Sequence, residues 1–135
     1  MPSAPAALQS AIFAALSADA TLTTLMGAPR IYDDVPQDAP FPYLSFGASI
    51  DRDWSTATEP GDEHLLTLHA WSRARGRREV HAILAAVRQA LHDHPLTLAG
   101  HRLVNLRHEF SEARADPDSD TYHGLLRLRA VTEPL

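Results

Sequence analysis

Four arginines lie within six positions of the segment LTLHAWSRARGRREVHAILAAVRQAL, residues 66–91. They are Arg73, Arg75, Arg77 and Arg78. Guanidinium groups this close together can hold phosphates through contacts that salt weakens. The segment offers only Trp71 as an aromatic platform, whereas readers of single strands interleave basic and aromatic side chains. A solvated turn between a strand and a helix is the competing interpretation, and each arginine at a helix N-terminus costs about 0.3–1 kcal/mol.

The sequence His92-Asp93-His94 contains residue types that bind transition metals. Residues two positions apart face away from each other on a helix, so both rings reach one ion only if the helix frays before Pro95. His108 falls on the apolar face of an expected strand, where a hydrogen-bonded core histidine is the simpler interpretation. We predict no metal site and no cofactor.

Several residue types that enzymes use are missing. The chain has no cysteine, which excludes disulfides, thiolate nucleophiles and thiolate metal sites. All 12 basic residues are arginine, which excludes a Schiff-base or phosphate-loop lysine. The six glycines are scattered, and no serine lies in a Gly-x-Ser-x-Gly elbow. We predict that the protein is not an enzyme.

Length and charge limit the other classes of function. A chain of 135 residues with 44% hydrophobic content suits one compact domain over residues 1–135. Its formal net charge of -5 gives no overall positive field to attract nucleic acid or an anionic membrane. The first 20 residues lack a positive n-region and predict an amphipathic helix, and no apolar run reaches membrane-spanning length. We expect a soluble protein that is cytoplasmic at synthesis.

Hydrophobic periodicity predicts helices and strands in a fixed order. The predicted helices cover residues 5–17, a short segment through Leu22 to Met26, and 77–92. The predicted strands cover 30–34, 42–50, 62–71, 96–99, 102–111 and 122–131. This order favours an α+β fold, in which an antiparallel sheet carries helices packed on one face as a two-layer sandwich.

Alternation along the strands predicts which side chains face the helices. In 42–50 the inward set is Leu44, Phe46, Ala48 and Ile50. In 102–111 it is Val104, Leu106 and Phe110. The opposite face is polar, with Arg107, Glu109, Arg127, Arg129 and His69, and could pack against a neighbour or line a lumen.

The direction of the chain predicts where the charges lie. If each element runs antiparallel to its neighbour, loops 51–61 and 111–121 emerge at one end, opposite Arg73 to Arg78. The first loop carries three acidic residues and one arginine, and the second carries four and one, giving -2 and -3. We therefore predict a subunit with one acidic and one basic end.

The two long loops are the best candidates for binding partners. Hairpin loops usually need only about 2–5 residues, so loops of this length call for another purpose. Trp54 lies in the first loop, where either a partner or the edge of its own sheet must cover the indole. The residues predicted to form protein interfaces are Asp51, Arg52, Asp53, Trp54, Glu59, Arg73, Arg75, Arg77, Arg78, Glu112, Arg114, Asp116, Asp118 and Asp120.

Four segments of the chain resemble the tail-completion or tail-terminator proteins of long-tailed phages and gene transfer agents. They are ADATLTTLMGAPRIYDDVPQDAPFPYLSFG, LLTLHAWSRARGRREVHAILAAVRQAL, PLTLAGHRLVNLRHEF and DTYHGLLRLRAVTE. The strongest marks are Pro42 to Gly47, Trp71 ahead of the helix, and Tyr122-His123-Gly124. None of these marks is a catalytic signature.

The resemblance implies a structural subunit without a cofactor. It would assemble with itself as a ring, a hexamer, that caps the tail tube protein and offers a docking face to the head-side connector. It would act in the host cytoplasm during assembly and then in the particle tail, with no membrane partner and no sequence-specific nucleic acid, although DNA can pass through the lumen. The alternative is a small nucleic-acid-binding module that uses the basic turn and the arginines of the outer sheet face.

Overall fold

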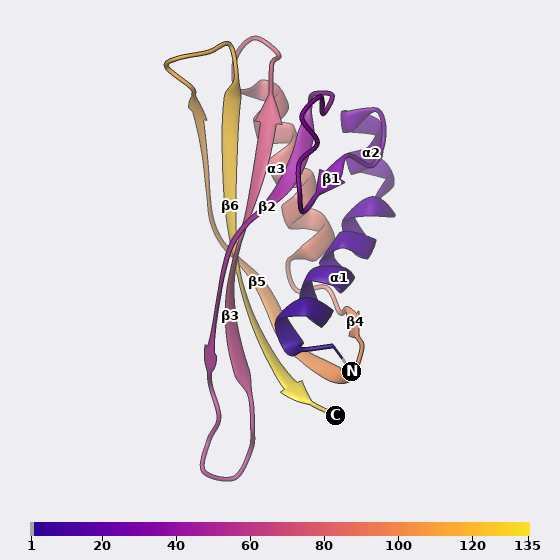
Figure 1. Ribbon diagram of the computed structural model, residues 1–135, viewed down its shortest axis with the longest axis vertical. Helices are drawn as coiled ribbons and strands as arrows, with labels where there is room; N and C mark the ends of the chain where they lie inside the picture. Colours follow the sequence, from indigo (N-terminus) through magenta and orange to yellow (C-terminus); the bar gives the residue numbers. More distant parts are fainter. Residues whose placement is uncertain (1) are drawn as a thin grey trace.

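The computed structural model describes residues 2–135, which form three helices and a six-stranded sheet (Figure 1). The helices are α1 (Ala4–Ser17), α2 (Ala20–Met26) and α3 (Arg78–Leu91). The strands are β1 (Ile31–Tyr32), β2 (Tyr43–Asp53), β3 (Asp62–Ser72), β4 (Thr97–Leu98), β5 (His101–Ala115) and β6 (Tyr122–Pro134). The helices pack on one face of the sheet, as predicted for an α+β sandwich. The other face carries no helix, and we call it the uncovered face.

The strand order is β1-β2-β3-β6-β5-β4. The four long strands lie in the middle and alternate in direction, because β2 pairs antiparallel with β3, β3 with β6, and β6 with β5. The two-residue strands lie outside them, and β1 pairs parallel with β2, so the sheet is mixed. Two ends follow from this path. The hairpin end holds loop 54–61, and the turn end holds the turn 73–77 that leads into α3.

Local signals set the helix boundaries. Ser3 caps α1 by accepting a hydrogen bond from the amide of Ala6, and Asp19 caps α2 by accepting one from Leu22 at 2.9 Å. Gly27 ends α2 in the left-handed region, with φ of 83°. Within residues 2–135, no helix is long and apolar enough to cross a membrane.

The core lies between the helices and the sheet. Its buried side chains come from all three helices and from β1 to β6, and include Leu8, Ile12, Ile83, Leu126 and Leu128. The helix α3 packs tightly against β6 at Gly124, where an added Cβ atom would lie 2.5 Å from Cγ1 of Val80. The glycine is therefore needed for the close packing of helix on sheet.

Three side chains predicted to face the helices are exposed instead. Ile50, Val104 and Phe110 have 50%, 47% and 46% of their surface exposed. The cause is a bulge in β2 between Phe46 and Ser49 and two bulges in β5, one at Val104 and one between His108 and Phe110. Each bulge inserts one residue, which reverses the alternation of faces along the strand.

The predicted separation of acidic and basic ends is wrong for one of the two loops. The strand before β5 is only two residues long, so it does not cross the sheet, and β5 begins at the hairpin end. It therefore finishes at the turn end, where the loop 116–121 lies beside the arginine-rich turn (Figure 1). Only the loop 54–61 lies opposite these arginines.

Candidate assembly surfaces

The arginine-rich turn is exposed, as predicted, but it has an acidic neighbour. Arg73 lies 3.7 Å from a carboxylate oxygen of Asp120, and its guanidinium carbon lies 4.1 Å from the ring centre of Phe41. Among the described residues, Arg75, Arg77 and Arg78 form no ion pair. Three unpaired guanidinium groups are thus available to a partner at the turn end.

The predicted residues of 111–121 divide between two places. Glu112 and Arg114 belong to β5, where they lie opposite Leu125 and His123 on the uncovered face. Asp116, Asp118 and Asp120 lie in the loop at the turn end. The second acidic loop and the arginines consequently form one charge-mixed surface.

The loop 54–61 forms an ordered acidic tip at the hairpin end. The Ser55 hydroxyl donates to Asp53 at 2.6 Å, and this bond lowers the pKa of the Asp53 carboxyl. The amide of Thr56 donates to the carbonyl of Glu59 at 2.8 Å. Asp51, predicted to belong to this surface, instead points toward the helices and contacts His64.

Trp54 lies beside a cluster of charged residues on the uncovered face. Its ring centre is 5.8 Å from the guanidinium carbon of Arg52 and 5.3 Å from that of Arg129. Both arginines also donate to the carboxylate of Glu63, which is almost fully buried. We call Arg52, Glu63, Arg129 and Trp54 the ionic cluster. Half of the Trp54 surface is still exposed, so the indole can also contact another molecule.

The hydrogen bonds in the ionic cluster fix the charge of Glu63. The hydrogen bond from Arg52 is the main cause of a lowered pKa for this carboxyl. Burial opposes that effect, and Arg129 adds to it. The alternation of residues in β3 does not indicate a buried acid at this position. The signal that could have revealed it is the pair of arginines on the two flanking strands.

A second cluster occupies the uncovered face at the turn end. The rings of Trp71 and His123 stack with centres 4.2 Å apart and an interplanar angle of 12°. Nδ1 of His69 lies 2.7 Å from Nε2 of His123, and the indole nitrogen of Trp71 donates to the Ser45 hydroxyl at 3.1 Å. We call His69, Trp71 and His123 the imidazole–indole cluster.

The two imidazoles of this cluster are held neutral. Burial is the main cause of a lowered pKa for both His69 and His123. The positive charge of Arg114 acts in the same direction on both rings. A hydrogen bond between two ring nitrogens also requires a neutral acceptor, so the geometry and the charges agree.

The three marks of the family resemblance meet in this cluster. Trp71 stacks on His123, and the following Gly124 lies beneath α3. An added Cβ atom at Gly47 would lie 2.4 Å from Nε2 of His69. These residues are thus explained by packing at the turn end.

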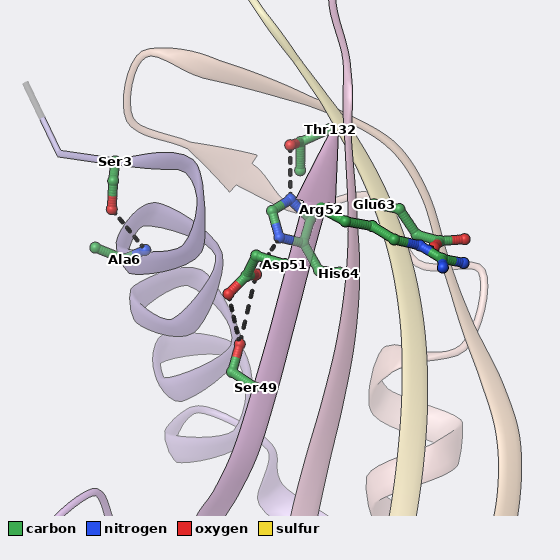
Figure 2. A network of polar contacts seen from close by, with 8 residues as sticks. All are labelled: Ser3, Ala6, Ser49, Asp51, Arg52, Glu63, His64 and Thr132. Carbon is green, nitrogen blue, oxygen red and sulfur yellow. Dashed lines mark hydrogen bonds and ion pairs between the residues drawn. The ribbon is translucent and has the colours of Figure 1, made fainter. Parts of the chain in front are cut away.

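A buried network on the helix side has the appearance of a catalytic triad (Figure 2). Asp51 contacts Nδ1 of His64 at 2.5 Å, and Nε2 of His64 lies 2.8 Å from the hydroxyl of Thr132. Both His64 and Thr132 have none of their surface exposed. A substrate cannot reach the hydroxyl, so the network joins β2, β3 and β6 and does not present a nucleophile.

The histidines do not assemble into a metal centre in residues 2–135, where no group of three or more His, Asp or Glu could hold an ion. His92 instead accepts a hydrogen bond from the amide of His108 at 2.9 Å. His108 in turn contacts the hydroxyl of Ser111 at 2.7 Å, and it is partly exposed, not a core residue.

The uncovered face is basic although the whole chain is acidic. In residues 2–135 the strand register places six arginines and three glutamates on it, a formal charge of +3. The arginines are Arg52, Arg102, Arg107, Arg114, Arg127 and Arg129, and the glutamates are Glu63, Glu112 and Glu133. The predicted interface list contained three of these nine residues and missed the rest.

Comparison with known proteins agrees with the fold. Residues 10–133 match the family model described as Tail completion protein gp17. A curated relative, Tail completion protein gp17 of Bacillus phage SPP1, is 25% identical over 100 residues, which are 74% of each chain. A chain in the virion of a native gene transfer agent particle is 32% identical, with a TM-score of 0.88 over 98% of this chain and 99% of that one.

These matches define a structural component of phage-type tails. The chain belongs to the tail completion protein gp17 family. A further solved structure, 13% identical with a TM-score of 0.55, shares the fold alone.

Proposed function

We propose that the protein assembles as a hexameric ring that caps the tail tube and joins it to the head-side connector, as a structural and not an enzymatic component. Family membership and the likeness to a chain of a gene transfer agent virion support this assignment. The ring would form in the host cytoplasm and remain in the particle tail.

The observation that carries the proposal is the difference between the two ends of the subunit. The hairpin end has an acidic tip with Asp53, Glu59 and Asp62, whereas the turn end has free arginines beside acidic residues. In a ring with aligned subunits, these ends form two different annular faces, which favour unlike partners on the two sides. The predicted interface residues on both ends are part of this proposal.

Native mass spectrometry of the purified chain, with and without tail tube protein, tests the ring. We expect a closed oligomer, and we expect the double variant R77E/R78E to weaken docking of a partner ring while leaving the fold intact. The single variants R77E and R88E form a matched pair, because both arginines are exposed and only the first lies in the turn. A chain that stays monomeric at tens of micromolar even beside tube protein would contradict the proposal.

Contact with nucleic acid is the second candidate, and the charge of +3 on the uncovered face favours it. Arginines on this face would contact phosphates without reading sequence, so binding would weaken steeply with salt. Fluorescence anisotropy with duplex DNA should then show a loss of affinity in R127Q/R129Q. An isolated chain that binds DNA tightly without forming any ring would favour this candidate over the first.

A further inference from the structure

The outer edge of β2 is open over most of its length. Within residues 2–135, β1 pairs only with Leu44 and Ser45, and the segment 49–53 beyond the bulge has no partner strand on that side. The amide of Trp54 bonds across the hairpin to Gly61 at 2.8 Å. Backbone groups alternate sides along a strand, so those of 49, 51 and 53 point to the open edge.

The outer edge of β5 is open at the other end of the sheet. Near the hairpin end it is covered, since the amide of Asp93 donates to the carbonyl of Leu106 at 2.8 Å, and the amide of His108 donates to His92. Beyond the second bulge, no strand in the described part of the chain pairs with the outer side of 110–115. Open strand edges of this length promote pairing with another chain.

The two open edges are complementary in direction. The strands β2 and β5 lie on opposite sides of the long four-stranded sheet and run antiparallel to each other. Rotation about an axis roughly along the strands preserves strand direction, so β5 of one copy meets β2 of the next in antiparallel orientation. We propose that neighbouring copies in the ring join by antiparallel pairing of 110–115 with 49–53; this inference rests on the proposed ring.

The open segments lie at different heights, and the required stagger can be estimated. The register across the sheet runs from Ile50 through Leu65 and Arg129 to Arg107. Within one copy, Ile50 is thus level with Arg107. Pairing Ile50 with Glu112 of a neighbour therefore requires a shift of five residues along β5, of which one is the bulge residue and adds no length. Four residue steps at about 3.4 Å each give a stagger of about 14 Å.

This stagger matches the geometry of a closed barrel. Four strands spaced about 4.8 Å apart make each copy about 19 Å wide, and about 14 Å of shift per copy corresponds to a strand tilt of about 35°. Strands in closed barrels tilt by about 35–45°. The result does not depend on the number of copies, because width and stagger are both counted per subunit.

The handedness of the fold decides which face lines the lumen. The connection from β3 through α3 to β5 is a right-handed crossover, with α3 behind the sheet in the upper half of Figure 1. The right-handed twist of strands makes barrel strands coil right-handed about the axis. With the helices outside, the coil brings 49–53 of the next copy level with 110–115. With the helices inside, the shift has the opposite sign, and the parts of the two edges that β1 and β4 already cover would meet. Only the arrangement with the helices outside joins the open segments, so the uncovered face lines the lumen.

Side chains on the two edges agree with this pairing. Ile50 and Phe110 are each about half exposed on the uncovered face, one on either edge. The open segment 49–53 carries two aspartates and one arginine, a charge of -1, and 110–115 carries one glutamate and one arginine and is neutral. Apolar contact without repulsion between like net charges thus favours two copies of this chain at these edges.

Disulfide trapping tests the pairing directly, because the chain has no cysteine of its own. The variant I50C/E112C places one thiol on each edge, both on the uncovered face. Within one copy these positions are separated by three strand spacings across the sheet and four residue steps along it, about 20 Å in all, which is too far for an internal disulfide. The controls are each single variant and A85C/E112C, in which one thiol moves to the exposed surface of α3. I50C/F110C and I50C/R114C sample the registers two residues to either side.

Oxidation of the assembled ring should convert I50C/E112C into a covalent ladder on a non-reducing gel, with the largest product matching the mass of the native ring. The controls should give only monomer and, for single variants, traces of dimer. If native mass spectrometry shows a ring but none of the three registers cross-links above the controls, the edge pairing is wrong and the proposed function stands. If no ring forms with or without tube protein, both proposals fail.

Discussion

The ionic cluster and the imidazole–indole cluster lie at opposite ends of the same uncovered face and protect their polar groups in different ways. At the hairpin end, Glu63 is buried by charged neighbours, with guanidinium groups that donate to it from β2 and β6. At the turn end, His69 and His123 share a hydrogen bond as neutral rings under an indole. A sheet face without helices can therefore bury polar side chains with other side chains alone.

The difference predicts where the face resists change and where it can adapt. At the turn end, stacking on His123 and the hydrogen bond to Ser45 together hold the Trp71 ring in one orientation. In the ionic cluster the two arginines keep part of their surface in water, and Trp54 is half exposed. We infer that the imidazole–indole cluster stabilises the fold and that the ionic cluster is available for assembly.

Trp71→Ala is the change expected to have the largest effect. Loss of the stacked indole and its hydrogen bond should lower the free energy of unfolding by about 2–4 kcal/mol. Trp54→Ala removes only exposed cation–π contacts and should cost no more than about 1 kcal/mol. Urea denaturation of both variants measures the difference. Equal losses at the two tryptophans would remove the distinction between the two clusters.

Gly124→Val tests whether packing against α3 supports the turn end. The added side chain would meet Val80 and Leu84, whose nearest atoms lie 2.5–3.2 Å from the place that a Cβ atom would take. Overpacking of this kind costs about 1–3 kcal/mol, which a thermal melt can detect. Gly76→Ala is the control without overpacking, because nothing lies within 4 Å of the place that its Cβ atom would take. Its φ of 85° still adds backbone strain. A neutral Gly124→Val would show that α3 is free to move away from β6.

The order of elements could be predicted because the core positions repeat regularly. The helix α3 has buried Val80, Ile83 and Val87 at helical spacing, and the inward set Leu126, Leu128 and Ala130 alternates along β6. No residue is inserted within either stretch, so the spacing of apolar residues in the sequence matches the face that they occupy in the structure.

The predictions that failed depended on single residues that carry no pattern. One inserted residue in β2 turns Ile50 outward and Asp51 toward His64, and sequence periodicity does not show where a bulge will fall. The charge separation failed because the strand at 97–98 is too short to cross the sheet. The ionic cluster was missed because it joins residues far apart in the chain, Arg52, Glu63 and Arg129.

The two clusters should respond to pH in different ranges. Folding lowers the pKa of His69 and His123, so the unfolded chain binds protons more readily below the usual histidine pKa of about 6.5. Their contribution to stability is complete above that pH and is lost as pH falls through the lower folded values. The pKa of Glu63 is also lowered, but from about 4.5, so its contribution is lost only in more acidic solution.

Urea denaturation at pH 7.5, 6.5, 5.5 and 4.5 measures this dependence. The free energy of unfolding should fall across the series, and H69Q/H123Q should flatten the fall between pH 7 and 5. His108, whose pKa burial also lowers, leaves a smaller slope in that variant. E63Q should lower the free energy of unfolding across the series, because Arg52 and Arg129 lose their carboxylate partner, and should change the slope only near the acidic end. An unchanged slope in H69Q/H123Q would show that the paired imidazoles do not govern stability near neutral pH.

The smallest effect is expected where the charge prediction was corrected, at the exposed pair of Arg73 and Asp120. Their side chains are 57% and 81% exposed and 3.7 Å apart, so a double-mutant cycle with R73Q and D120N should give a coupling below about 0.5 kcal/mol. R73Q alone should cost more than D120N, because the guanidinium also lies over Phe41. A coupling above about 1 kcal/mol would mean that charge pairing, and not ring packing, orders the turn end, and would make the two ends of the uncovered face alike.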